Sequence, residues 1–222
     1  MAIINIKSKE RKPAALLFFM FFSIVSATIT GASVRDAVFL TQFDKSYLPV
    51  MFITIAVVMA GVIALYKKLT AGQDQIFVIS ISGALFSVSL FLLQSNLSGL
   101  FIPVLYIWME VVTILSIFQF WILAGEVFNA RQAKRIFTLM GAGGSFAGMG
   151  AGYGIKPFVS TFGSENLLFL TIFFIGISVV MAQMLRPFRM SHKPKKVNSK
   201  PVAKSKTEFE PYLKSIALLI GL

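Results

Sequence analysis

The sequence predicts an all-α membrane protein built as a bundle of six membrane-spanning helices. Of its 222 residues, 56% are hydrophobic and only 14% are charged, so the chain is more apolar and less charged than a soluble domain. The apolar residues gather in six runs, and short basic clusters between the runs carry much of the net charge of +12. So much apolar surface cannot be hidden in a water-soluble core, and basic clusters between apolar runs are typical of membrane topology.

Each apolar run is interpreted as one helix, since about 20 residues span about 30 Å of hydrocarbon. The first run is longer than the apolar region of a signal peptide, which is about 7–15 residues, so it is expected to remain as a helix. The charged pair Arg35-Asp36 either ends this helix or is carried onward in it, whereas Lys156-Pro157 is expected to close the fifth. The six predicted helices occupy residues 14–33, 47–66, 76–93, 100–124, 138–153 and 167–185.

Polar segments flank the bundle, which is predicted over residues 14–185. Residues 1–13 form a basic, cytoplasmic amino end, and residues 186–211 form a basic cytoplasmic linker, rich in Lys and Pro, whose composition is typical of disorder. Residues 212–222 begin another apolar run, which is too short to span and is expected to be the start of a truncated seventh helix.

Basic residues alternate between the two sides of the predicted bundle. They are frequent in the amino end, in the loops after the second and fourth helices and in the tail, and sparse in the other loops. Positively charged loops stay in the cytoplasm, so both ends of the chain are predicted to be cytoplasmic. Six helices in this orientation match one half of a major-facilitator-type transporter, which is built from two inverted three-helix repeats.

Glu110 is an acid in the middle of the predicted fourth helix. It lies ~14 Å from the start of that helix, near the middle of the bilayer. A carboxylate at this depth is costly unless it is paired, protonated or facing water. Glu110 is therefore a candidate for contacting a substrate or coupling a proton. The alternative is a structural hydrogen bond to a neighbouring helix.

Arg35 follows a stripe of small residues at four-residue steps on the predicted first helix: Ser23, Ala27 and Gly31. A small face lets a helix or a ligand approach closely, and a guanidinium can hold phosphate through two parallel hydrogen bonds. Asp36 is adjacent to Arg35, so it points to another face and is expected to have different partners. The alternative for both is an interfacial charge pair at a helix end. The candidate substrate-binding residues are Arg35, Asp36, Glu110 and Lys156.

The polar hairpin between the predicted fourth and fifth helices has two interpretations. It either anchors the chain by its positive charge or forms a cytoplasmic gate, in which Glu126 pairs with a cation when the site is closed to the inside. The candidate gating residues are Glu126, Arg131, Lys134 and Arg135.

Glycines recur every four residues along the predicted fifth helix, at Gly144, Gly148 and Gly152. A phosphate-binding loop would need a preceding strand and a following Lys-Ser or Lys-Thr, and neither is present. Close helix packing is the better interpretation of these glycines.

Several other function classes are disfavoured by the sequence. The chain has no cysteine, and its single His192 has no partner at ligand spacing, so neither a metal nor a cofactor is expected. No nucleophile–base spacing indicates an enzyme. The cations are not interleaved with aromatic residues on one face, which disfavours nucleic acid as a partner.

The hairpin region resembles the ATP:ADP antiporter family of plastids and intracellular bacteria, together with its wider bacterial relatives. The matching features are Phe120-Trp121, Ala124, the Ala-Lys-Arg run at 133–135, and Gly141 with Gly143. Arg35-Asp36 falls where that family carries Lys-Asp, and Glu110 falls where it carries a glutamate in the fourth helix. The resemblance covers the first five helices and is specific mainly over residues 106–150. Gly125-Glu126 replaces the Asn-Gln of the nucleotide exchangers, as in the less characterised bacterial branch.

The resemblance implies a membrane transporter that exchanges ATP and ADP, or moves another phosphorylated or anionic metabolite, by alternating access. It implies roles in nucleotide transport for Arg35 and Glu110, and a bacterial inner membrane as the location. The family has about twelve helices, so the chain is expected to be an amino-terminal half whose partner is a carboxy-terminal half, and to be unable to transport alone. The alternative from a different class is a non-transporting membrane scaffold or regulatory module.

Overall fold

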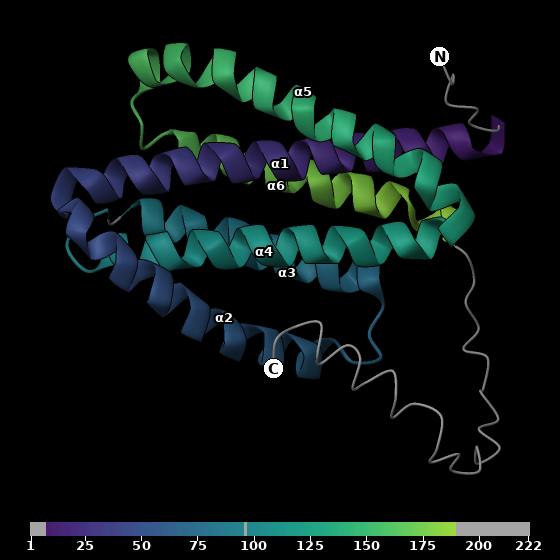
Figure 1. Cartoon of the computed structure of the whole chain (residues 1–222), viewed down its shortest axis with the longest axis horizontal. Helices are drawn as coiled ribbons and strands as arrows, with labels where there is room; N and C mark the ends of the chain where they lie inside the picture. The colour runs from purple at the N-terminus through teal and green to yellow at the C-terminus, as the bar shows by residue number, and fades with distance from the viewer. Residues whose placement is uncertain (1–7, 96, 190–222) are drawn as a thin grey trace, which may run out of the picture. The chain divides into compact units, whose positions relative to one another are not determined.

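The computed structural model describes residues 8–95 and 97–189, with side chains from Glu10 onward except at positions 130, 131 and 133–135. Within these residues the chain is helical and contains no strand (Figure 1). The long helices are α1 (Ser8–Gln42), α2 (Leu48–Thr70), α3 (Gln75–Gln94), α4 (Phe101–Val127), α5 (Ala130–Phe162) and α6 (Leu167–Met184). Two short 3-10 turns are η1 (Lys45–Tyr47) and η2 (Arg186–Phe188). The predictions for residues 1–7 and 190–222, including the truncated seventh helix, lie outside the described residues.

Five of the described helices are long and apolar enough to cross a membrane, namely α1, α2, α3, α4 and α6, so the chain is an all-helical membrane protein. The fifth helix of the predicted six-span bundle, α5, is 33 residues long but is not among these five. Its glycines, hydroxyl residues and charged residues lower its mean hydropathy.

One helix end was left open by the sequence and another was predicted wrongly. Of the two alternatives for the first helix, the structure confirms the one in which the helix carries the charged pair onward, since α1 runs to Gln42. The fifth helix does not close at Lys156-Pro157 but continues to Phe162, where Gly163 takes a positive φ of 86° and ends it. A proline removes one backbone hydrogen bond, and a helix in a membrane protein often continues through it.

The helices run up and down between two ends of the bundle (Figure 1). The first end, named here the basic end, contains the start of α1, residues 71–74, residues 128–129 and η2. The opposite end contains the connections at residues 43–47, 97–100 and 163–166. The segments that the sequence shows to be rich in Lys and Arg therefore lie, as far as they are described, at one end of the bundle.

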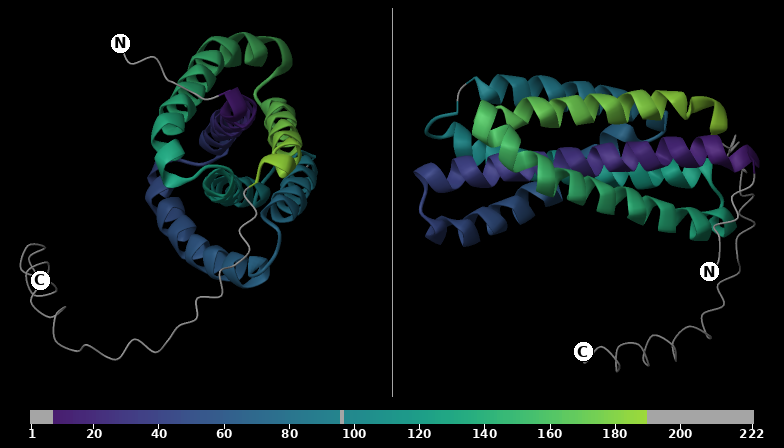
Figure 2. Two further views of the ribbon diagram at one scale, coloured as in Figure 1. Left: turned by 90° about the vertical axis from the view of Figure 1, so that its right-hand side faces the viewer. Right: turned by 90° about the horizontal axis from the view of Figure 1, so that it is seen from above.

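α1 is the central helix, and Figure 2 shows it enclosed by the others when the bundle is viewed along its helices. It packs against α4, α5 and α6, while α4 also packs against α2 and α3, and α3 packs against α6. These packed pairs have an internal symmetry: if α1, α2 and α3 are matched with α4, α5 and α6 in that order, every one of them has a packed counterpart. The counterparts α1 and α4 run in opposite directions (Figure 1). Two inverted three-helix repeats would give this pattern of packing.

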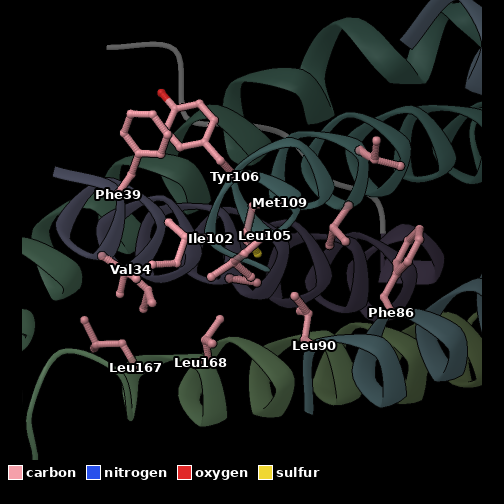
Figure 3. Close-up of a cluster of buried hydrophobic side chains, with 14 of the residues drawn as sticks. Val34, Phe39, Phe86, Leu90, Ile102, Leu105, Tyr106, Met109, Leu167 and Leu168 are labelled. Carbon is pink, nitrogen blue, oxygen red and sulfur yellow. The ribbon is translucent and has the colours of Figure 1, made fainter. Parts of the chain in front are cut away.

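The core consists of two apolar clusters along the bundle. The cluster nearer the opposite end is formed around Val34, Leu105 and Met109, and its aromatic members Phe39 and Tyr106 lie side by side (Figure 3). The cluster nearer the basic end is formed around Leu17 and Phe120. Lipid tails are as apolar as these side chains, so close packing and interhelical hydrogen bonds provide much of the association energy.

Buried and half-buried polar side chains connect the helices. Thr30 of α1 and Thr171 of α6 share a hydrogen bond of 2.9 Å. Gln119 of α4 donates to Ser82 of α3 over 2.9 Å, and Trp108 of α4 donates to Ser89 of α3 over 2.8 Å. In an apolar surrounding each such bond is worth about 0.6 kcal/mol on average.

Two glycines allow especially close helix contacts. A Cβ added at Gly31 would lie 2.0 Å from Cε of Met109, so α1 and α4 approach closely just one turn before Arg35. A Cβ added at Gly83 would lie 2.4 Å from Cγ2 of Val179, which marks the contact of α3 with α6. The small-residue stripe predicted on the first helix is therefore confirmed as a packing surface at Gly31.

Candidate functional site

An ion pair joins α1 and α4, which are counterparts of each other in the pattern of packed helices. Nη1 of Arg35 on α1 donates to Oε1 of Glu110 on α4, although the two residues are 75 positions apart in the chain. Both residues lie within apolar helices of membrane-spanning length. Since an unpaired charge is costly at such a position, each residue supplies the partner that the other requires.

Asp36 also binds Arg35, so the prediction that these neighbours have different partners is wrong. Nε of Arg35 lies 2.8 Å from Oδ1 of Asp36. Adjacent residues point to different faces of a helix, but the long arginine side chain can bend its guanidinium back towards its neighbour. Arg35 is therefore held by two carboxylates, one from its own helix and one from α4.

Aromatic rings complete the surroundings of the guanidinium. Its carbon atom lies 4.5 Å from the ring centroid of Tyr106, a cation–π contact. The Tyr106 ring lies 4.8 Å from that of Phe39, which stacks on Phe43 at 5.1 Å. No role was predicted for Tyr106, yet the sequence contains the signal: it lies four residues before Glu110 and therefore shares its helix face.

The ion pair is partly open on one side. The side chain of Arg35 is 12% exposed, that of Glu110 is 26% exposed and that of Asp36 is 50% exposed. The site is thus a surface patch on α1 and α4 that retains access for a ligand, with the guanidinium as its most covered part.

Two apolar grooves lie elsewhere on the bundle. One of about 420 Å³ is formed by α2, α3 and α4, and one of about 330 Å³ is formed by α1, α5 and α6. Neither Arg35 nor Glu110 lines either groove. The helices that form one groove are the counterparts of those that form the other, when α1, α2 and α3 are matched with α4, α5 and α6.

The structure does not bring Lys156 into the ion-paired group. Lys156 is exposed on α5, beside a shallow groove that it lines together with Ile29 of α1. No ion pair among the described residues joins it to the carboxylates around Arg35. Its predicted contact with a substrate stays a prediction.

The three glycines spaced four residues apart on α5 differ in how closely other atoms approach them. A Cβ added at Gly144 would lie 3.3 Å from Cε1 of Phe21 on α1, so this position packs closely. A Cβ added at Gly148 or Gly152 would meet no atom within 4 Å. Within the described part of the chain, the predicted close packing is therefore seen at Gly144, and at the other two positions it stays a prediction.

A second group of charged side chains links three parts of the chain at the basic end: the segment before α3, the end of α4 and the residue after η2. Arg189, which follows η2, donates through Nη1 to Oδ2 of Asp74, and its Nε lies 2.8 Å from Oε2 of Glu126 at the end of α4. Arg189 was assigned to the disordered linker, and no pattern around it in the sequence indicated these partners. The other predicted gating residues, Arg131, Lys134 and Arg135, lie in the first turns of α5, but their side chains lie outside the described residues.

Asp74 has a second role in this group because it caps α3. Its Oδ1 accepts from the backbone N–H groups of Ile76 and Phe77 at 2.9 and 3.1 Å. The hydrogen bond from Arg189, assisted by these two N–H groups, lowers the pKa of Asp74 below its usual value of 3.8. A lowered pKa in the folded state means that the charged carboxylate stabilises the fold above about pH 4 and stops doing so as the pH falls further.

We expect Asp74→Asn to remove this acid sensitivity. Asparagine keeps the cap, since it is as good an N-cap residue as aspartate, but it cannot form the ion pair with Arg189. Between about pH 6 and pH 3 the wild type should lose up to about 1 kcal/mol more stability than the variant, because the pair is largely exposed and screened by solvent. Denaturant unfolding in detergent at the two pH values measures the difference. Glu165→Gln, at an exposed position, is the control, and equal acid losses in the wild type and Asp74→Asn would contradict the assignment.

Comparison with protein-family models, with curated protein sequences and with solved structures finds no match to this chain. The class that the fold and the site define is an all-helical membrane protein with an ion-paired guanidinium among its apolar helices.

Proposed function

We propose that this chain forms one half of an alternating-access transporter for phosphorylated or other anionic metabolites, with ADP and ATP as the first candidates. The carrying observation is the ion pair of Arg35 with Glu110 between α1 and α4. Ionisable residues within membrane-spanning helices are costly, so they are usually retained for transport, proton transfer or ligand binding. The resemblance to the ATP:ADP antiporter family supports a nucleotide as the substrate.

The packing of the helices supports the major-facilitator-type architecture. In such proteins the substrate site lies near the bilayer midplane and alternating access moves one unit against another. The correspondence of α1 with α4 is what an inverted repeat would produce, and the ion pair lies between these two helices. A second six-helix unit would form the opposing wall of the path, with the chain placed in a bacterial inner membrane and both ends in the cytoplasm.

The charged group at the basic end supports a gate on the proposed cytoplasmic side. Arg189 connects the start of α3, through Asp74, with the end of α4, through Glu126. A connection of this kind holds the ends of three helices together while the site is closed to the inside. Arg131, Lys134 and Arg135 are further candidates for the same gate.

A specific observation favours the alternative, a non-transporting membrane scaffold. Arg35 already has two carboxylate partners and an aromatic face within the chain itself. A pair that is satisfied in this way can also act as a structural clamp between two helices. The two functions differ in whether Arg35 binds an added anion.

Binding of labelled ADP in nanodiscs, to the full-length protein in which this chain is proposed to form one half, tests the proposal. Arg35→Ala should weaken binding at least about tenfold, since a hydrogen bond to a charged group is worth about 1.5–3 kcal/mol. Arg35→Lys should retain part of the affinity, because it keeps the charge but loses the two parallel donors. The double variant Arg35→Leu/Glu110→Leu removes both charges together, so its loss of binding cannot be attributed to an unpaired buried acid.

Lys45→Ala serves as the matched control, since Lys45 is an exposed cation in η1 at the opposite end of the bundle. It should bind ADP as the wild type does. Unchanged binding in the Arg35 variants, or no binding of ADP and ATP by the wild type, would favour the scaffold.

A further inference from the structure

The guanidinium of Arg35 has no free edge for an anion. An oxyanion is held best by two parallel N–H groups, which lie either on the edge formed by Nε and Nη2 or on the edge formed by Nη1 and Nη2. Asp36 takes Nε, and Glu110 takes Nη1. Each edge therefore has one nitrogen that already donates to a carboxylate, and release of Glu110 gives an oxyanion an edge whose two nitrogens are both free of carboxylates.

The charges of the group also oppose an anion. When all three residues are ionised, one guanidinium faces two carboxylates, so the group carries one net negative charge. A bound oxyanion would add further negative charge among apolar helices, where charges are weakly screened. Neutralising one carboxylate removes both obstacles, because it frees an edge of the guanidinium and cancels the excess charge.

Glu110 is the carboxylate that can respond in this way. Without Arg35 it would be a single charge within an apolar helix, whereas Asp36 is half-exposed to solvent. The charged or titratable groups that face Glu110 are Arg35 and Asp36 from α1 and Tyr106 from its own helix. α3 has no ionisable side chain along its length, and the titratable residues of α2 lie in its last turns, at the basic end.

We propose that binding of an oxyanion to Arg35 is coupled to uptake of one proton by Glu110, a mechanism that rests on the proposed transport function. Glu110 takes one proton from hydronium or buffer in the solvent and releases Nη1, while Arg35 stays charged throughout. The oxyanion then accepts hydrogen bonds from Nη1 and Nη2, and Asp36 keeps its bond to Nε.

The test measures ADP binding to the full chain in nanodiscs from about pH 5 to pH 8, with Glu110→Gln as the reference. Glutamine mimics the protonated form of Glu110 and does not titrate. The variant therefore reports how binding changes with pH because ADP itself changes its protonation. The affinity of the wild type relative to that of Glu110→Gln should fall by about tenfold for each pH unit once Glu110 is ionised in the free protein. Titration calorimetry of the wild type in two buffers of different ionisation enthalpy should show about one proton taken up per ADP, beyond the change on ADP.

Glu165→Gln, an exposed acid in the connection from α5 to α6, should follow the wild-type pH dependence. Parallel pH curves for the wild type and Glu110→Gln, with ADP bound by both, would overturn the coupling and leave the proposed function standing. A relative affinity that rises with pH would also overturn it, because charged Glu110 would then assist binding. No ADP binding by either protein at any pH would instead overturn the proposed function.

Discussion

Arg35→Ala is expected to lower the free energy of unfolding by about 1–3 kcal/mol, the usual cost of leaving a covered polar group without its partner, because the ion pair is only partly buried. The loss arises because the Glu110 carboxyl group loses its cationic partner within an apolar helix. Glu110→Gln should cost less, since Asp36 still neutralises Arg35. Unfolding in mixed detergent micelles, followed by circular dichroism, measures these differences.

The double variant Arg35→Leu/Glu110→Leu separates charge from packing. Replacing both members of a buried pair by apolar residues is often neutral or stabilising, so this protein should recover most of the stability that Arg35→Ala loses. Lys45→Ala should unfold as the wild type does. A double variant no more stable than Arg35→Ala would show that the ion pair is not the cause of the loss.

Gly83→Leu is expected to separate α3 from α6. Even a Cβ at this position would lie 2.4 Å from Cγ2 of Val179, and valine in a helix has one strongly preferred rotamer. Overpacking of this kind costs about 1–3 kcal/mol. The measurement is again unfolding in micelles, accompanied by accessibility of single cysteines placed on α3, which the absence of native cysteine makes unambiguous.

Two matched glycine variants sharpen this expectation. Gly61 lies in α2 with no atom within 4 Å of an added Cβ, so Gly61→Leu should be neutral or slightly stabilising. Gly31→Ala should cost less than Gly83→Ala, although its nearest contact is shorter, because the end of Met109 can swing away. Equal losses for Gly61→Leu and Gly83→Leu would contradict the packing explanation.

Much of the fold was predictable because the position of each helix in a membrane protein depends mainly on the hydropathy and charge of its own segment. The runs at 76–93 and 167–185 became α3 and α6 almost at the predicted limits. The limits were uncertain where charged residues lie inside a helix: the sequence left the end at Arg35-Asp36 open, and the end predicted at Lys156-Pro157 was wrong. A local pattern treats such residues as ends, whereas partners or a partly exposed face allow the helix to continue.

The candidate site was predictable in its residue types but not in its pairing. Arg35 and Glu110 stand out as charges beside or within apolar runs, but the predicted depths place Glu110 near the bilayer middle and Arg35 at a helix end, so depth alone does not pair them. That Asp36 binds the same guanidinium depends on side-chain rotamers, which no sequence spacing reveals. Arg189 could not be found either, because its partners come from two distant helix ends and its surroundings resemble a polar linker.

The adjacency of Arg35 and Asp36 has a consequence for biosynthesis. A nascent chain is made from its amino end, so α1 is complete before the 75 residues that lead to Glu110 have emerged. Placing an isolated arginine in the bilayer during that interval would be costly. Asp36 is already on the same helix and bonds Nε of Arg35, so it neutralises the cation from the outset. The partner on the same helix thus allows α1 to insert early, before the second partner on α4 arrives.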